Sequence, residues 1–184
     1  NTVIQSRAVT FNADKETMYR IHLWSSLVVR IIEPIYTFKA QDPDELYDRI
    51  KEVDWSMIMQ IDHTFKIDTV VYSSYFKHSQ YAGLRMKDAI CDFFREETGK
   101  RPDIDVNKPN FTFVLSIWED EVQLALDLTG DPLFKRRYRS QSSDAPLNEI
   151  LAAGIIELSN WDKKMPFLDG MCGSGTIAIE ALFK

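Results

Sequence analysis

The sequence predicts an α+β fold that ends in the start of an α/β unit. Segments with helical spacing of apolar residues mix with segments whose apolar residues recur at every second position. Near the C-terminus an apolar pair, Phe167 and Leu168, leads into a glycine-rich turn and a second apolar run, as where a buried strand meets a helix. With 45% hydrophobic residues over 184 positions, the chain can bury the cores of one or two small domains.

Strands and helices are both predicted in the first third of the chain. We expect a strand over residues 3–11, a helix over 15–26, a strand over 27–38 and a helix over 42–53. The last of these places Leu46, Ile50 and Val53 on one face, which is typical of a helix that packs on a sheet.

The remaining elements follow from the same patterns. They are a strand over 65–71, a helix over 80–97, a hairpin of 111–118 and 122–128 that turns at 119–121, and a helix over 145–159. Asp144 and Pro146 are the expected start signals of that last helix, which leads to the glycine-rich turn.

The glycine-rich turn is the stretch that best indicates a ligand. Its glycines run Gly170-x-x-Gly173-x-Gly175, which fits neither the phosphate loop with a following Lys nor the dinucleotide fingerprint. Asp169 would repel a pyrophosphate, but it could accept hydrogen bonds from a ligand with cationic groups, such as S-adenosylmethionine. Gly173 and Gly175 would let the backbone pass close to that ligand, and Ser174 or Thr176 is the expected cap of the next helix.

Five blocks of sequence carry a family resemblance. Residues 169–176 (DGMCGSGT) resemble the D-P-M-C-G-S-G-T loop of S-adenosylmethionine-dependent RNA methyltransferases with an N-terminal THUMP domain, although Gly170 stands in place of Pro. The other similar blocks are 78–90, 101–105, 127–139 and 145–149. The chain is most similar to the bacterial enzymes that methylate the exocyclic N2 amine of guanosine in large-subunit (23S) ribosomal RNA.

The resemblance implies a domain order and a cofactor site. Residues 1–40 would be part of a ferredoxin-like domain, 41–131 the THUMP domain, 132–144 a basic linker, and 145–184 the first βα unit of a Rossmann-like methyltransferase domain. S-adenosylmethionine would be bound by the residues of the glycine-rich turn, namely Asp169, Gly170, Cys172, Gly173, Ser174, Gly175 and Thr176. Cys172 is expected to be a buried thiol beneath the turn rather than a nucleophile, because no histidine lies near it.

The catalytic residues of the family are not found in this sequence. The family uses an Asn or Asp followed by Pro-Pro and an aromatic residue, and the printed sequence has no such segment. We therefore expect an internal fragment whose catalytic residues lie beyond Lys184 and which is inactive by itself.

RNA, most simply ribosomal RNA with transfer RNA as a second possibility, is the expected partner despite a net charge of -6. Basic and aromatic residues gather in two places, and the expected RNA-binding residues are Lys77, His78, Tyr81, Arg85, Lys87, Lys135, Arg136 and Arg139. A polar helix face is the alternative explanation of the first group, and a solvated linker explains the second group equally well.

Composition excludes several other classes. There is no apolar run long enough to span a membrane, so no membrane partner is expected. Two cysteines are too few for a disulfide framework, and the three histidines lack the spacing of metal ligands, so no metal is expected. A cytoplasmic protein fits these features. A transfer-RNA guanosine-N2 methyltransferase, a DNA amine methyltransferase and a non-catalytic RNA-binding module stay open as alternatives.

Overall fold

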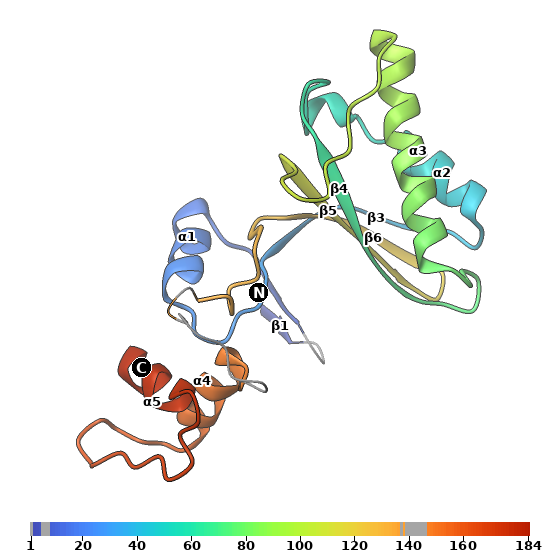
Figure 1. The fold of residues 1–184 in the computed structure, drawn as a ribbon. Helices are drawn as coiled ribbons and strands as arrows, with labels where there is room; N and C mark the ends of the chain where they lie inside the picture. Colours follow the sequence, from blue (N-terminus) through green and yellow to red (C-terminus); the bar gives the residue numbers. More distant parts are fainter. Residues whose placement is uncertain (1, 5–7, 137, 139–146) are drawn as a thin grey trace. The chain divides into compact units, whose positions relative to one another are not determined.

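The computed structural model describes residues 2–4, 8–136, 138 and 147–184. The chain divides into two compact units, which we describe separately. Unit 1 comprises Asn1–Ile31 and Asp131–Lys184, and unit 2 comprises Ile32–Gly130. Helices and strands occur together along the chain, which confirms the predicted α+β class (Figure 1).

Unit 2 is built on a four-stranded sheet with the order β3-β6-β5-β4. The strands are β3 (Ile32–Lys39), β4 (Phe65–Tyr72), β5 (Phe111–Trp118) and β6 (Glu121–Asp127). β6 runs antiparallel to both β3 and β5, whereas β4 and β5 are parallel. Parallel neighbours need a crossover connection, and a helix provides it here.

Two helices cover one face of this sheet (Figure 1): α2 (Pro43–Lys51) and α3 (Ser79–Thr98). α2 begins where Asp42 accepts hydrogen bonds from two backbone amides and Pro43 supplies a preset φ. α3 ends at Gly99, which adopts the left-handed conformation with φ 72°. The predicted positions of both helices are therefore confirmed to within a residue or two at each end.

The core of unit 2 lies between the helices and the sheet. Trp55, in a short 3-10 helix (Trp55–Met57), is fully buried, and its ring packs edge-on against Phe113 with centroids 5.2 Å apart. Its indole N–H donates to the carbonyl of Ile50 at 2.9 Å, so the burial leaves no polar atom of the side chain unpaired. Phe65, Leu115 and other apolar side chains of both layers complete this closed core.

The described part of unit 1 contains a two-stranded antiparallel ribbon and three helices. Its elements are β1 (Thr2–Ile4), β2 (Val9–Phe11), α1 (Lys15–Trp24), α4 (Glu149–Leu158) and α5 (Thr176–Phe183). α4 and α5 contact each other and bury Ala152, Ala153, Ile156 and Ala181, whereas α1 has no buried residue.

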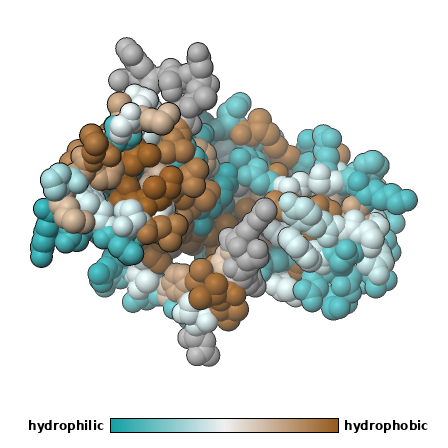
Figure 2. All heavy atoms as spheres, turned by 90° about the horizontal axis from the view of Figure 1, so that it is seen from below, coloured by the Kyte–Doolittle hydropathy of each residue, from teal (hydrophilic) through white to brown (hydrophobic). Residues whose placement is uncertain are grey.

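Much apolar surface of unit 1 is exposed. Figure 2 shows hydrophobic residues gathered on the left side of the view, where unit 1 lies. Leu158, Leu168, Met171 and Leu182 are each more than four-fifths exposed, at 85%, 91%, 93% and 83%. An exposed apolar surface of this kind is more typical of an interaction surface than of ordinary protein surface.

Several predicted elements differ in their limits. The strand predicted over 3–11 is two short strands, β1 and β2, and the strand predicted from residue 27 begins at Ile32, where pairing with Asp127 of β6 begins. The last predicted helix begins at Glu149 with Asn148 as its cap; the expected start signals Asp144 and Pro146 lie outside the described residues.

The strand predicted at Phe167 and Leu168 is not formed. Phe167 is 38% exposed, and neither residue pairs with a strand among the described residues. An isolated parallel strand has no partner for its backbone hydrogen bonds and no sheet face to bury, so this segment forms no strand.

Candidate functional site

The glycine-rich turn lies between the segment ending at Leu168 and helix α5, and Asp169 is its first residue. One carboxylate oxygen of Asp169, Oδ1, accepts a hydrogen bond from the amide of Met171 at 3.1 Å, which holds the turn. The other oxygen, Oδ2, is buried and has no hydrogen-bond partner among the described residues. A buried carboxylate oxygen without a donor is unfavourable, so Asp169 has room for one further donor.

Two glycines shape the remainder of the turn. Gly173 and Gly175 have φ values of 51° and 76°, in the left-handed region that side chains rarely adopt. The amide of Gly175 donates to the carbonyl of Cys172 at 2.7 Å and closes the turn. Cβ atoms built at Gly170, Gly173 or Gly175 would meet nothing within 4 Å, so the backbone of the turn faces open space.

Two local expectations about this turn are wrong. The sequence predicts Ser174 or Thr176 as the cap of α5, but the cap is Gly175, which has a left-handed backbone, and no side chain makes a capping hydrogen bond there. The hydroxyl oxygens of Ser174 and Thr176 lie 3.2 Å from each other. Cys172 is exposed rather than buried beneath the turn. Cys91, by contrast, is buried, and burial raises the pKa of its thiol, so it is no activated nucleophile.

The described turn therefore offers a ligand three kinds of group. They are the unpartnered carboxylate oxygen of Asp169, a glycine backbone that a ligand can approach closely, and the amides at the start of α5. A ligand with a cationic group near the acid and polar atoms along the backbone fits these groups. The predicted cofactor residues thus lie together in one turn.

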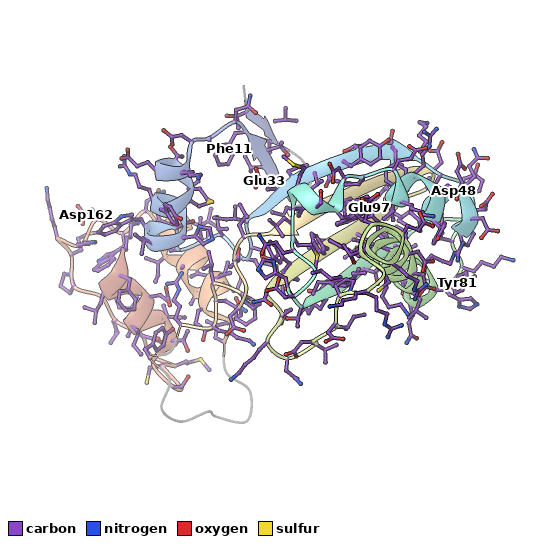
Figure 3. The ribbon with its side chains drawn as sticks, turned by 90° about the horizontal axis from the view of Figure 1, so that it is seen from above. Phe11, Glu33, Asp48, Tyr81, Glu97 and Asp162 are labelled. Atoms are coloured by element: carbon purple, nitrogen blue, oxygen red, sulfur yellow. The ribbon has the colours of Figure 1, made fainter. Side chains whose placement is uncertain are left out.

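A second candidate site lies at the start of α3 in unit 2. Lys77, His78 and Tyr81 line an open hollow together with Ser79, Gln80 and Leu84. Tyr81, labelled in Figure 3, is in the first turn of the helix and is 50% exposed. The first turn contains no acidic residue, and the side chain of His78 makes no capping bond, so the helix amides and the nearby cations favour an anion.

The other two members of this predicted group already have intramolecular partners. The guanidinium of Arg85 donates to the carboxylate of Asp44 at 2.7 Å and lies 4.5 Å from the ring centroid of Tyr47, which joins α3 to α2. Lys87 pairs with Asp88 at 2.9 Å. Arg85 therefore has a packing role in unit 2, and three of the five predicted residues share the hollow.

The predicted RNA-binding residues of the basic segment after unit 2 also have intramolecular partners where the structure describes them. Lys135 is exposed and pairs with Asp131 at 3.5 Å, whereas Arg136 pairs with the buried carboxylate of Glu180 in α5. Arg139 lies outside the described residues. Sequence reasoning missed Glu180; the available signal was a single acid within the otherwise apolar run of α5.

The described residues lack the features of two other classes of site. No described helix is both long and apolar enough to cross a membrane. Within the same part of the chain, no three His, Cys, Asp or Glu side chains are grouped so that they could hold a metal ion.

Comparison with protein families now defines the class of protein. Residues 40–127 match the THUMP domain, and residues 136–183 match the RMKL-like methyltransferase domain. The chain therefore combines a segment that matches the THUMP domain with a segment that matches the RMKL-like methyltransferase domain.

Among curated proteins, the chain is similar to two named ribosomal RNA large subunit methyltransferase K/L. The protein of Syntrophotalea carbinolica is 42% identical over 97% of this chain, and that of Colwellia psychrerythraea is 40% identical over 99%. The chain spans 26% of the length of each relative.

Solved structures agree with the fold. A predicted N6-adenine-specific DNA methylase from Listeria monocytogenes superposes with a TM-score of 0.85 at 30% identity, and a putative methyltransferase, SMU.472, solved with SAH, superposes with 0.84 at 30% identity. Each match covers 99% of this chain and 48% of the other. TrmN from Thermus thermophilus, at 17% identity and a TM-score of 0.66, shares the fold.

Proposed function

We propose that the protein carrying this chain is an RNA methyltransferase that transfers a methyl group from S-adenosylmethionine to the exocyclic N2 amine of guanosine in 23S ribosomal RNA. The single observation that supports this proposal most directly is the glycine-rich turn, with its unpartnered Asp169 oxygen, within the residues that match a methyltransferase domain. The names of the two relatives support ribosomal RNA as the substrate.

Two features of the turn support S-adenosylmethionine as its ligand. Asp169 Oδ2 lacks a donor, and a hydroxyl or ammonium group of the cofactor would supply one. Gly173 and Gly175 leave open space beside the backbone, which the cofactor would occupy without meeting a Cβ atom. The relative solved with SAH supports the same ligand class.

When bound, S-adenosylmethionine supplies a methyl group on a sulfonium, which makes the carbon electrophilic. The accepting amine of guanine is a weak nucleophile because its lone pair is delocalised into the ring, so the enzyme has to orient it and accept its hydrogen bonds. The Asn/Asp-Pro-Pro-aromatic segment expected for that task does not occur in these 184 residues. Within this chain, Asp169 and the turn bind and orient the cofactor.

The cofactor proposal is tested by substitution of Asp169 in the intact protein. Asp169→Asn, and Asp169→Ala with a larger effect, should raise the dissociation constant for S-adenosylhomocysteine by roughly tenfold or more, since a charge-assisted hydrogen bond is lost. Isothermal titration calorimetry measures the change.

Asp162→Asn is the matched control. Asp162 also accepts an amide two residues ahead, from Lys164 at 3.0 Å, but it is exposed and lies outside the turn. The affinity of the Asp162→Asn protein for S-adenosylhomocysteine should match that of the unmodified protein. Unchanged affinity in Asp169→Ala would refute the assignment of this carboxylate to the cofactor.

Unit 2 is proposed to recruit the RNA through the hollow at the start of α3. Lys77 places a positive charge and His78 an imidazole beside the start of the helix, and Tyr81 presents an exposed ring on which a base can stack. The THUMP match over residues 40–127 supports a role of this unit in binding RNA.

The RNA proposal predicts a change in salt dependence. Lys77→Gln should weaken binding of a 23S fragment and reduce the slope of log K against log salt by about 0.7–0.9, the contribution of one phosphate contact. Lys39→Gln, which removes an exposed lysine paired with Asp120, is the control. Filter binding with ribosomal and transfer RNA compares the two substrates, and tighter binding of transfer RNA would contradict the ribosomal assignment.

A further inference from the structure

Glu180 is a buried carboxylate within the apolar helix α5, and it faces two residues from the segment after unit 2. Its side chain is 0% exposed. One carboxylate oxygen is paired with the guanidinium of Arg136, and the other accepts a hydrogen bond from the hydroxyl of Tyr138 at 3.0 Å. Both oxygens are therefore satisfied, which a buried carboxylate requires.

Arg136 extends the same network to a third segment. Its second terminal nitrogen, Nη2, donates to the backbone carbonyl of Ser26 at 2.7 Å, just after α1. One planar guanidinium thus joins the N-terminal segment of unit 1 to α5, and its side chain is only 20% exposed. A lysine, with one ammonium group, does not reproduce this two-armed geometry.

The network acts on the helix that follows the glycine-rich turn. Gly175 caps α5, and its carbonyl accepts from the amide of Ile179 at 2.9 Å, so turn and helix are continuous. Glu180 lies five residues beyond Gly175, about 7.5 Å along the helix axis at the usual rise per residue. Contacts that hold Glu180 in place therefore also hold the backbone of the glycine-rich turn in place.

We propose that Arg136 and Tyr138 are positioning residues that hold α5, through Glu180, so that the glycine-rich turn keeps its cofactor-binding geometry. The inference deepens the proposed function and rests on it for the identity of the ligand. It also gives Arg136 a role different from contact with RNA phosphate. The buried pair with Glu180 is the observation that separates the two roles.

The test uses Arg136→Lys, Arg136→Gln and Tyr138→Phe in the intact protein. Each should raise the dissociation constant for S-adenosylhomocysteine, by roughly fivefold for Tyr138→Phe and Arg136→Lys and by more for Arg136→Gln, since a hydrogen bond that aligns the turn is lost. Affinity for the RNA fragment should stay within about twofold, because these groups face Glu180 rather than the α3 hollow.

Hydrogen exchange of the peptide over residues 169–176 provides a readout that does not depend on the cofactor. Exchange there should accelerate in all three variants while the unit 2 core is unchanged. Arg49→Gln is the control, because Arg49 forms an exposed pair with Glu52 at 3.4 Å. Should Arg136→Gln fail to fold, the two milder variants still decide the question.

Three outcomes are distinguishable. Unchanged ligand affinity and unchanged exchange in Tyr138→Phe and Arg136→Lys would overturn the positioning role. Loss of RNA affinity with intact ligand affinity would overturn it as well and assign Arg136 to phosphate binding. If the unmodified protein binds no S-adenosylhomocysteine, the proposed function fails, and exchange of the turn still supports or overturns the positioning role.

Discussion

At Gly83 the helix α3 packs close against strand β4. A Cβ atom at this position would lie 2.9 Å from Cγ2 of Thr69 in β4, closer than carbon atoms tolerate. Thr69 is β-branched and has few rotamers, so its methyl group cannot move aside cheaply. Glycine therefore occurs within a long helix because of packing, even though it weakens the helix itself.

Gly83→Ala should accordingly destabilise the protein. The gain in helix propensity is about 1 kcal/mol, and the overpacking cost of about 1–3 kcal/mol exceeds it. Urea denaturation measures the difference. Gly154→Ala in α4 is the matched control, because its nearest neighbour, Leu27, is 3.8 Å away, so alanine should stabilise there. Stabilisation by both substitutions would show that Thr69 does not constrain the helix. Thr69→Ser, which removes the methyl group, should restore stability lost in Gly83→Ala.

The candidate site was predictable only where its chemistry is local in sequence. Asp169 and the glycines follow one another within seven positions, so their spacing identified the turn before the structure did. Glu180 and Arg136 are 44 positions apart, and no periodicity links them. The prediction of a buried Cys172 is wrong because residue type indicates an average preference for burial, whereas the burial of one side chain depends on which segments pack against it.

At the scale of elements, α2 shows how a helix start is fixed by a few side-chain contacts. Asp42 accepts from the amides of Asp44 and Glu45 at 2.9 and 2.8 Å, and the carboxylate of Glu45 accepts from the amide of Gln41 at 2.9 Å. These bonds satisfy two amides of the first helical turn and one amide just before the helix.

Asp42→Ala should lower the free energy of unfolding by about 1 kcal/mol, within the range of about 0.5–2 kcal/mol for a lost N-cap. Asp42→Asn keeps an accepting oxygen and should retain most of the stability. Asp48→Ala, in the exposed part of the same helix, is the control and should change stability by less than about 0.5 kcal/mol. Equal losses at Asp42 and Asp48 in chemical denaturation would contradict the capping role.

Element positions were predictable where a periodic pattern extended over several turns or residues, as in α3 and the β5–β6 hairpin. They were not predictable where tertiary pairing sets the limits. β3 begins at Ile32 because its partner strand ends there, and the segment at Phe167 and Leu168 has the composition of a strand but no neighbour to pair with. The two-residue turn of the hairpin also places Glu119 at a positive φ of 52°, which residue type does not suggest.

The Glu119 turn is held by contacts from outside the hairpin. The backbone amide of Ser74 and then its hydroxyl lower the pKa of the Glu119 carboxyl, because both donate to the ionised form. A lowered pKa stabilises the fold above the carboxyl's ordinary value of 4.5, and this contribution is lost as the pH falls through the lowered value.

At the scale of the whole molecule, the two units differ in how completely they bury their apolar side chains. Unit 2 closes a core between one sheet and two helices, whereas unit 1 leaves residues such as Leu158 and Leu182 largely in solvent. Composition predicted the capacity for a core but not its distribution, because burial depends on which segments pack together. The α+β class itself was predictable, because the spacing of apolar residues in each segment indicates whether that segment is a helix or a strand.

The strand order in unit 2 affects how the sheet folds. Only β5 and β6 are joined by a short turn; β3 reaches β6, and β4 reaches β5, across long intervening stretches of chain. Closing a long loop costs entropy before any contact repays it. The hairpin is therefore the natural template, and both outer strands depend on it for their partners. Damage to β5 would deprive β4 and β6 of a neighbour, and damage to β6 would deprive β3 and β5 of one.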